Sequence, residues 1–195
     1  MRFTGEGAVE KGVAERPFEL AVGAHTVPGL LWSPAEAVGI RPLVLLGHGG
    51  TNHKRSPYIL SAARLFVRHH DVAAAALDAP GHGERAAPGW DRSRMTLEEF
   101  RQHLYADRTF DETIEEWKAA LDAVQRLDGV GAGPVGYWGL SMGTALGIPF
   151  IAAEPRVRAA VLGLMGAMAG RVLRDAPAVR CPLLFLQQLE DELMS

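Results

Sequence analysis

Short, continuously apolar runs alternate with amphipathic stretches along most of this chain. Such runs are typical of strands covered on both faces of a sheet, and the run that begins at Val135 leads into a glycine-rich turn. The predicted strands are residues 17–20, 27–32, 42–46, 72–77, 158–164 and 183–187, with one more strand that begins at Val135.

Two amphipathic stretches predict helices. The first follows Ser56, which is suited to cap a helix, and Pro57, which is favoured in a first turn. Its apolar side consists of Ile59, Leu60, Ala63, Phe66 and Val67. The second is introduced by Thr109 and Glu112, which have the spacing of a capping box, and is expected to end near Gly129. Its apolar side consists of Phe110, Ile114, Trp117, Leu121 and Val124.

The order of these elements predicts the fold class. Residues 17–20 and 27–32 are expected to pair as an antiparallel lead-in. From Pro42 onward strands alternate with helices, which predicts an α/β fold with a mainly parallel sheet and helices on both faces. A further helix should follow Ser141, and Pro149 should kink or end it. We expect residues 1–195 to form a single domain.

Residues 84–107 interrupt this alternation, and their first part, residues 84–94, is charged and is interrupted by Pro88 and Gly89. Thr96 and Glu99 form a capping box for a short helix within it. The apolar side of that helix consists of Leu97, Phe100, Leu104 and Tyr105. Two structures fit this pattern: a small lid over the strand ends, or a helix that packs on the sheet as core.

Composition narrows the possible partners. The 195 residues carry a formal net charge of -3, with dispersed basic residues, which argues against a nucleic acid or an anionic membrane as partner. Cys181 is the only cysteine, so neither an internal disulfide nor a cysteine-based metal site is expected, and the histidines lack metal-ligand spacing. No signal sequence or membrane-spanning run is evident, so we expect a cytoplasmic protein. We also expect no metal and no cofactor.

The stretch VGYWGLSMGTA at residues 135–145 contains a candidate nucleophile. A strand, a G-x-S-x-G turn and a helix in this order make a nucleophile elbow, in which a tight turn exposes the serine to a base. Gly139 and Gly143 supply the room that the turn needs. The helix that begins at Met142 directs free N–H groups towards Ser141, where they can stabilise an oxyanion.

Polar residues follow the strands at four points. They are His48-Gly49-Gly50, residues 78–83 (DAPGHG), Ser141 and residues 190–192 (EDE). Because ligands of open parallel sheets bind outside the carboxyl ends of the strands, we expect these groups to gather on one edge.

With these motifs the chain resembles the α/β-hydrolase superfamily, in its dienelactone-hydrolase-like or esterase-like branch, from about Pro17 to its end. The resemblance implies that the N–H groups of Gly50 and Met142 form the oxyanion hole. It also implies that residues 78–83 are mostly structural. Candidate residues lining the site are His48, Gly49, His82 and Phe100.

The resemblance also suggests the catalytic acid. In the family the acid follows the proline that begins its strand by nine residues, which selects Asp191, nine residues after Pro182. The neighbouring Glu190 and Glu192 leave a solvated acidic loop as the alternative.

Of the nucleophile, the acid and the general base, the general base is the one that the sequence does not supply at the expected place. In the family a histidine follows the acid, whereas all seven histidines here precede Ser141. We expect a truncated domain that lacks its last strand and helix, that is weakly active or inert, and that is poorly stable alone. Residues 183–187 would then be an open edge prone to self-association. The alternative is that His53, His82 or His103 supplies the base.

These features predict a serine hydrolase that forms an acyl-enzyme on Ser141 with a small ester-like substrate. Two alternatives stay open: a noncatalytic binding protein of the same fold, and a peptidase or thioesterase with the same triad.

Overall fold

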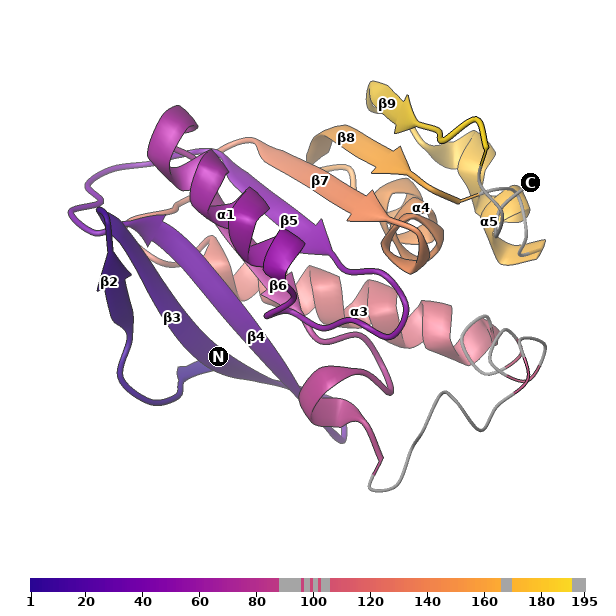
Figure 1. Cartoon of the computed structure of the whole chain (residues 1–195), viewed down its shortest axis with the longest axis horizontal. Coiled ribbons are helices and arrows are strands. Elements are labelled where there is room, and N and C mark those ends of the chain that lie inside the picture. Colours follow the sequence, from indigo (N-terminus) through magenta and orange to yellow (C-terminus); the bar gives the residue numbers. More distant parts are fainter. Residues whose placement is uncertain (88–95, 97–98, 100–101, 103–105, 166–169, 191–195) are drawn as a thin grey trace.

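The structure is a computed structural model, and it describes residues 1–87, 96, 99, 102, 106–165 and 170–190. One sheet organises these residues (Figure 1). Its strands are β1 Arg2–Phe3, β2 Ala8–Glu10, β3 Val13–Val22, β4 His25–Pro34, β5 Leu43–Gly47, β6 Ala73–Leu77, β7 Val135–Leu140, β8 Val157–Gly163 and β9 Leu183–Leu186.

The sheet has an antiparallel part and a parallel part. Its order is β1-β3-β4-β6-β5-β7-β8-β9, with β2 paired to β3. The hairpin of β3 and β4 joins β6 in antiparallel register, where Gly29 lies opposite Leu77. From β6 to β9 every neighbouring pair is parallel. The carboxyl ends of β5, β6, β7 and β8 therefore meet at one edge, which we call the carboxyl edge.

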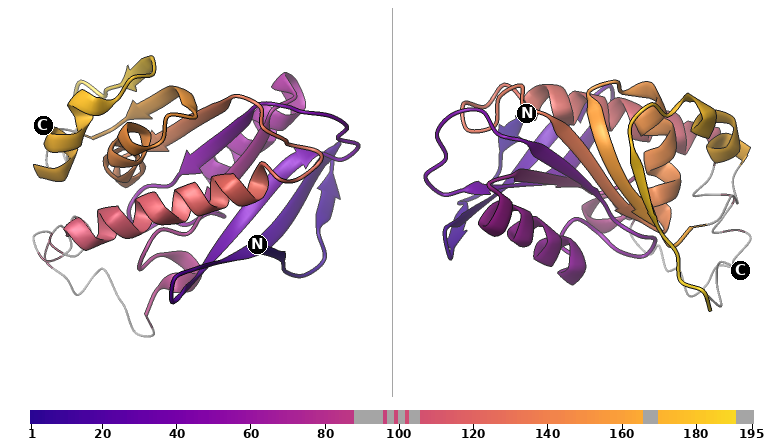
Figure 2. Two further views of the ribbon diagram at one scale, coloured as in Figure 1. Left: turned by 180° about the vertical axis from the view of Figure 1, so that it is seen from behind. Right: turned by 90° about the horizontal axis from the view of Figure 1, so that it is seen from above.

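Helices cover both faces of the sheet (Figure 2). Helix α1 lies on one face, while α3 and α4 lie on the other. The helices are α1 Pro57–His70, α3 Asp107–Val124, α4 Met142–Ala153 and α5 Gly170–Asp175, with short 3-10 turns η1 Gly83–Arg85 and η3 Ala176–Ala178. The predicted mainly parallel sheet with helices on both faces is confirmed.

Each helical layer encloses its own apolar core. On the α1 face, Ile59 and Ala63 pack against Trp32 and Leu46. On the opposite face, Phe110 and Leu121 of α3 belong to the larger cluster that includes most of α4. Helix α4 is buried from Met142 to Ile151, because it crosses the middle of the molecule. The elbow helix is therefore held along nearly its whole length.

Most predicted elements are confirmed, with shifts at their ends. The lead-in strands are longer than expected, and β1 and β2 were not predicted at all. The capping box of Thr109 and Glu112 is wrong, because α3 already begins at Asp107 and Glu112 pairs with Arg108 instead. Ser56 lies at the N-cap of α1, but its side chain makes no cap bond.

Two further expectations concern proline and the possible lid. Pro149 does not end α4, which continues to Ala153. The capping box of the excursion is confirmed: Thr96 N donates to a Glu99 carboxylate oxygen at 2.8 Å, and Glu99 N donates to Thr96 Oγ1 at 3.2 Å. Leu97, Phe100, Leu104 and Tyr105 lie outside the described residues, so lid and core packing both stay predictions.

Candidate active site

Ser141 occupies a strained turn between β7 and α4. Its backbone has φ 54° and ψ −119°, a conformation that side-chain-bearing residues rarely adopt and that the surrounding structure must impose. The Ser141 N–H donates to the Gly163 carbonyl at 2.8 Å, so the turn is tied to the end of β8. The turn predicted from the sequence pattern is thus present.

Two glycines make this turn possible. A Cβ at Gly139 would lie 2.6 Å from the Gly143 oxygen, and a Cβ at Gly143 would overlap the carbonyl oxygen of Gly47. Both obstacles are backbone atoms, which cannot move aside as a side chain can. The helix therefore packs directly against the ends of β5 and β7, which holds Ser141 at the carboxyl edge.

The buried Thr144 hydroxyl fastens the turn to β8. Its Oγ1 lies 2.8 Å from the Gly139 oxygen and 2.7 Å from the Gly163 oxygen, and it accepts the Gly163 N–H at 2.8 Å. One hydroxyl proton serves one of the two carbonyls at a time. Thr144 thus bridges the strand before Ser141 and the neighbouring strand.

The Ser141 side chain and the adjacent helix N-terminus have unused hydrogen-bonding groups. The Ser141 hydroxyl makes no cap bond and no other hydrogen bond to the described residues. Met142 is the first residue of α4, so its N–H has no intrahelical partner. No partner outside the helix is found for that N–H within the described chain. A hydroxyl and an N–H donor thus remain available beside each other.

His48 is a buried connector rather than a base. Its Nε2 accepts the Ala79 N–H at 3.0 Å, so Nδ1 carries the proton and donates to the Gly49 oxygen at 2.8 Å. Burial lowers the pKa of His48 to about 4, so the ring is neutral at physiological pH. With both nitrogens engaged, His48 links the loop after β5 to the loop after β6.

Side chains hold the backbone of the loop that follows His48. The Gly49 N–H donates to Tyr58 Oη at 2.6 Å, and Asn52 Nδ2 donates to the Gly50 oxygen at 2.9 Å. By contrast, the Gly50 N–H has no hydrogen-bond partner among the described residues. The resemblance assigned this N–H to the oxyanion hole.

A buried ion pair joins the same two loops. Lys54 Nζ lies 2.6 Å from Asp78 Oδ2, and the Lys54 N–H donates to Asp78 Oδ1 at 2.9 Å. The two side chains are 4% and 0% exposed. Burial alone would raise the pKa of Asp78, but bonds from Lys54 and from the Glu84 N–H hold it below its ordinary value. Asp78 is therefore a structural anion, as the resemblance implied for this loop.

A second ion pair connects the loop after β6 to α3. Arg85 donates to both carboxylate oxygens of Glu116, at 2.8 and 2.7 Å, and also to the Asp78 carbonyl at 3.1 Å. Sequence reasoning missed Lys54, Tyr58, Arg85 and Glu116. None of them belongs to a recognised motif, and their partners are distant along the chain.

The acid and base are less defined than the nucleophile. Asp191, Phe100 and His103 lie outside the described residues. His82 is buried, with Nδ1 2.9 Å from the Pro80 oxygen and its ring 5.5 Å from that of His48. His53 is exposed and accepts the Arg55 N–H. No hydrogen bond joins Ser141 to a histidine of the described chain.

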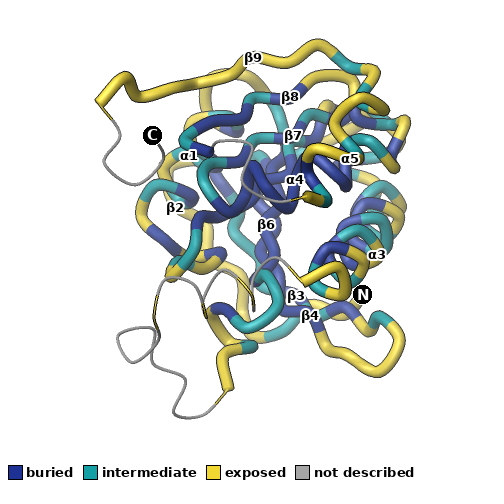
Figure 3. Tube along the Cα trace, turned by 90° about the vertical axis from the view of Figure 1, so that its right-hand side faces the viewer, coloured by how far each residue is buried: buried dark blue, intermediate teal, exposed yellow. Residues whose placement is uncertain are grey.

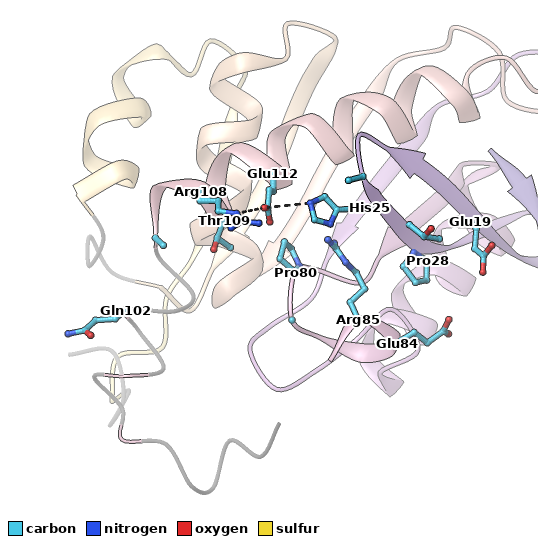
Figure 4. Close-up of a pocket in the computed structure, with 14 residues that line it drawn as sticks. Glu19, His25, Pro28, Pro80, Glu84, Arg85, Gln102, Arg108, Thr109 and Glu112 are labelled. Atoms are coloured by element: carbon cyan, nitrogen blue, oxygen red, sulfur yellow. Dashed lines mark hydrogen bonds and ion pairs between the residues drawn. The ribbon is translucent and has the colours of Figure 1, made fainter. Parts of the chain in front are cut away.

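A polar cavity among the described residues does not include Ser141. It has a volume of about 860 Å³ and lies between the β3–β4 turn, the loop after β6 and the start of α3. Figure 4 shows Glu112 between Arg108 and His25, with which it forms ion pairs of 2.7 and 3.9 Å. We therefore place the candidate chemistry at the elbow, where strain and free donors coincide.

The described part of the chain contains neither a metal-binding cluster nor a membrane-spanning helix. No group of three or more histidine, cysteine, aspartate or glutamate residues is placed to hold a metal ion. No helix there combines the length and apolar character needed to cross a bilayer.

No protein-family model and no curated protein matches this sequence, but solved structures do. A PEG-bound cold-adapted esterase from an Arctic intertidal metagenomic library is 41% identical, with a TM-score of 0.82 over 100% of this chain and 80% of that chain. A native structure of such an esterase gives 37% identity and a TM-score of 0.80 over 100% and 79%. A dienelactone-hydrolase-like promiscuous phosphotriesterase from metagenomic libraries shares the fold at 24% identity, with a TM-score of 0.71 over 94% and 72%.

The parallel sheet with a strained serine between strand and helix defines the class of an α/β hydrolase. At 41% identity over its whole length to a cold-adapted esterase, the chain belongs to the esterase-like branch of the α/β-hydrolase superfamily.

Proposed function

We propose that this protein hydrolyses carboxylic esters of small molecules through an acyl-enzyme on Ser141. The observation that carries the proposal is the φ of 54° at Ser141, combined with 41% identity to a protein described as an esterase. Backbone strain of this kind is maintained where it exposes a reactive group. The free hydroxyl of Ser141 further supports a role as nucleophile.

The oxyanion of the tetrahedral intermediate is proposed to be held by two backbone N–H groups, those of Gly50 and Met142. Gly50 lies in the loop after β5 and Met142 begins α4, so both lie at the carboxyl edge, and neither N–H has a partner among the described residues. Preorganised donors of this kind contribute strongly because they need no rearrangement during the reaction. Losing one such donor typically lowers kcat about 100-fold or more.

Asp191 is proposed as the acid that orients the base, as the resemblance implies. The base takes the Ser141 proton and returns it to the leaving alcohol. His48 is unsuited to this role, because both of its ring nitrogens are engaged and its pKa is about 4. His53, His82 and His103 are the candidates within the sequence, and a histidine outside these 195 residues is the fourth.

The test is covalent labelling by a fluorophosphonate, which reports an activated serine without requiring full turnover. We expect labelling at Ser141, its loss in Ser141→Ala, and unchanged labelling in Ser61→Ala, a control at an exposed serine of α1. The same pair is then compared for hydrolysis of short p-nitrophenyl esters. Absence of labelling in the folded wild-type chain, or equal labelling of Ser141→Ala, would sink the proposal.

Three further variants assign the base. His53→Gln, His82→Gln and His103→Gln are each labelled beside the wild type, with circular dichroism as the control for folding. If one of them alone loses reactivity, that histidine is the base. If all three keep the wild-type rate, none of these three histidines is the base that supports labelling.

A further inference from the structure

Side chains from the loop itself and from helix α1 hold the peptide groups that follow β5. His48 and Asn52, which belong to the loop, engage the carbonyl oxygens of Gly49 and Gly50. Tyr58 belongs to another element, helix α1, and engages the Gly49 N–H at 2.6 Å. Three of the four backbone polar groups of Gly49 and Gly50 are thus held. The fourth, the Gly50 N–H, has no partner in the described chain.

Because a peptide group is planar, these hydrogen bonds also fix the direction of the Gly50 N–H. In a trans peptide the C=O and the following N–H lie in one plane and point in opposite directions. Because His48 Nδ1 holds the Gly49 oxygen, the Gly50 N–H must point the other way. The orientation of this plane also depends on the peptide before it, whose N–H belongs to Gly49 and is held by Tyr58.

Tyr58 lies beside the elbow as well as beside the loop. A Cβ added at Gly49 would lie 3.5 Å from Tyr58 Oη and 3.7 Å from the Leu140 carbonyl oxygen, which belongs to the peptide before Ser141. The Tyr58 ring also lies 6.1 Å from that of Trp138 on β7, at a tilt of 46°. The phenol is therefore fixed between α1, the loop and the strand that carries the nucleophile.

We propose that Tyr58 is a positioning residue of the candidate oxyanion hole. Its phenol oxygen accepts a hydrogen bond from the Gly49 N–H, and the loop thereby presents the Gly50 N–H to the substrate oxygen. This inference rests on the proposed function, because it assumes that an oxyanion forms beside Ser141. Tyr58 acts through the loop and does not touch the reacting atoms.

The energetics favour this arrangement. Gly49 is buried, and leaving a buried N–H without an acceptor is destabilising. Without Tyr58 the loop would lower that cost by turning the peptide towards another acceptor, which would move the Gly50 N–H as well. Burial raises the pKa of the Tyr58 phenol above its ordinary value, so the oxygen stays a neutral acceptor at physiological pH.

The test uses Tyr58→Phe, which keeps the ring and removes only the acceptor. Tyr137→Phe is the matched control, because it also removes a buried phenol, one that donates to the Gly143 oxygen and not to this loop. The first readout is hydrogen exchange of the Gly49 amide by NMR. We expect exchange about tenfold faster in Tyr58→Phe, the factor that corresponds to about 1.4 kcal/mol, and no selective change in Tyr137→Phe.

The second readout is the rate constant for phosphonylation of Ser141 by a fluorophosphonate, whose transition state places an oxygen in the same hole. We expect a decrease of about tenfold in Tyr58→Phe, with little change in the noncovalent binding constant of the probe. An unchanged Gly49 exchange rate would overturn the inference, and so would faster exchange with an unchanged phosphonylation rate. If the wild type is not phosphonylated at all, the proposed function fails, whereas the exchange readout still reports the Tyr58 contact.

Discussion

The loops after β5 and β6 differ from the outer edge of the sheet at β9. In the loops, the charged side chains of Lys54 and Asp78 are 4% and 0% exposed and meet at 2.6 Å. On β9, the apolar side chains of Leu183, Leu184, Phe185 and Leu186 are 42–58% exposed. Figure 3 shows this contrast as dark strands in the centre and an exposed β9 at the margin. Charged side chains are thus buried on one side of Ser141, and apolar residues are exposed to solvent on the other.

The candidate site thus has two halves. The self-sufficient half is fixed by the described residues themselves, and the dependent half needs further contacts. Buried polar groups must be paired where they stand, so the loops that hold Gly50 are fixed by residues within the described chain. An apolar edge strand stays stable in water only when something covers it. The side of the site that leads to Asp191 therefore depends on contacts that the described residues do not supply.

The largest effect should come from the elbow that lies between the two regions. Gly143→Ala places a Cβ against the carbonyl oxygen of Gly47, and both groups are fixed by backbone packing. We expect a loss of about 4 kcal/mol or more in the free energy of unfolding, measured by urea denaturation. The matched control is Gly170→Ala, where no atom lies within 4 Å of the new Cβ. Equal stability of the two variants would show that the elbow is looser than this packing implies.

The next effect tests the self-sufficient half. Lys54→Met leaves the Asp78 carboxylate buried without its cation, and we expect a loss of about 3 kcal/mol in unfolding free energy. The control is Arg2→Met, which removes an exposed pair with Glu19 and should cost less than about 1 kcal/mol. If the two variants lose equal stability, the buried pair contributes no more than a surface pair.

The same pair predicts a pH dependence. The folded pKa of Asp78 lies below its ordinary value of 3.8, so the unfolded chain binds the proton more readily. The contribution of Asp78 to stability is therefore fully present above that ordinary value and is lost as the pH falls through the folded pKa. We expect Asp78→Asn to flatten the acid limb of the unfolding free energy as the pH falls below 3.8, whereas an equally steep limb there would contradict this assignment.

A smaller effect should follow from the buried Thr144 hydroxyl. Thr144→Val keeps the shape but leaves the Gly163 N–H without its acceptor, at a cost of about 2 kcal/mol in unfolding free energy. Thr144→Ser retains the hydroxyl and should recover most of the loss. Fluorophosphonate labelling of Ser141 should fall in the valine variant and return with serine. If labelling changes in neither variant, the Thr144 hydroxyl does not affect the reactivity of Ser141.

The smallest effect on stability, and a distinct effect on assembly, is expected on the dependent half. We propose that β9 mediates association between two copies of the chain, because it is apolar and no strand of the described residues pairs with its outer edge. Leu184→Lys should shift the chain towards monomer in sedimentation velocity and change the unfolding free energy by less than about 0.5 kcal/mol. Leu65→Lys, at an exposed position of α1, is the control and should not alter the mass. A wild type that is monomeric at all concentrations would remove the proposal.

The apolar runs and local motifs were readable from the chain alone, because each depends on neighbours within a few residues. Continuous apolar runs predicted β5 to β9, and Gly139 and Gly143 around Ser141 predicted the elbow. Ser56 followed by Pro57 predicted the start of α1, although the serine side chain does not cap it. The resemblance named Gly50 and Met142, and both N–H groups have no partner among the described residues.

The contacts that shape the candidate site were decided by tertiary structure. Lys54 and Asp78 are 24 residues apart, and Arg85 and Glu116 are 31 apart, so no local pattern links either pair. Tyr58 reads in the sequence as an ordinary residue of a helix start, and only the approach of α1 to the loop after β5 gives its oxygen the Gly49 N–H. The same holds for His48, since its neutral state follows from burial and from the Ala79 N–H. Such roles depend on how distant backbone groups meet and how deeply they are buried, and folding alone sets both.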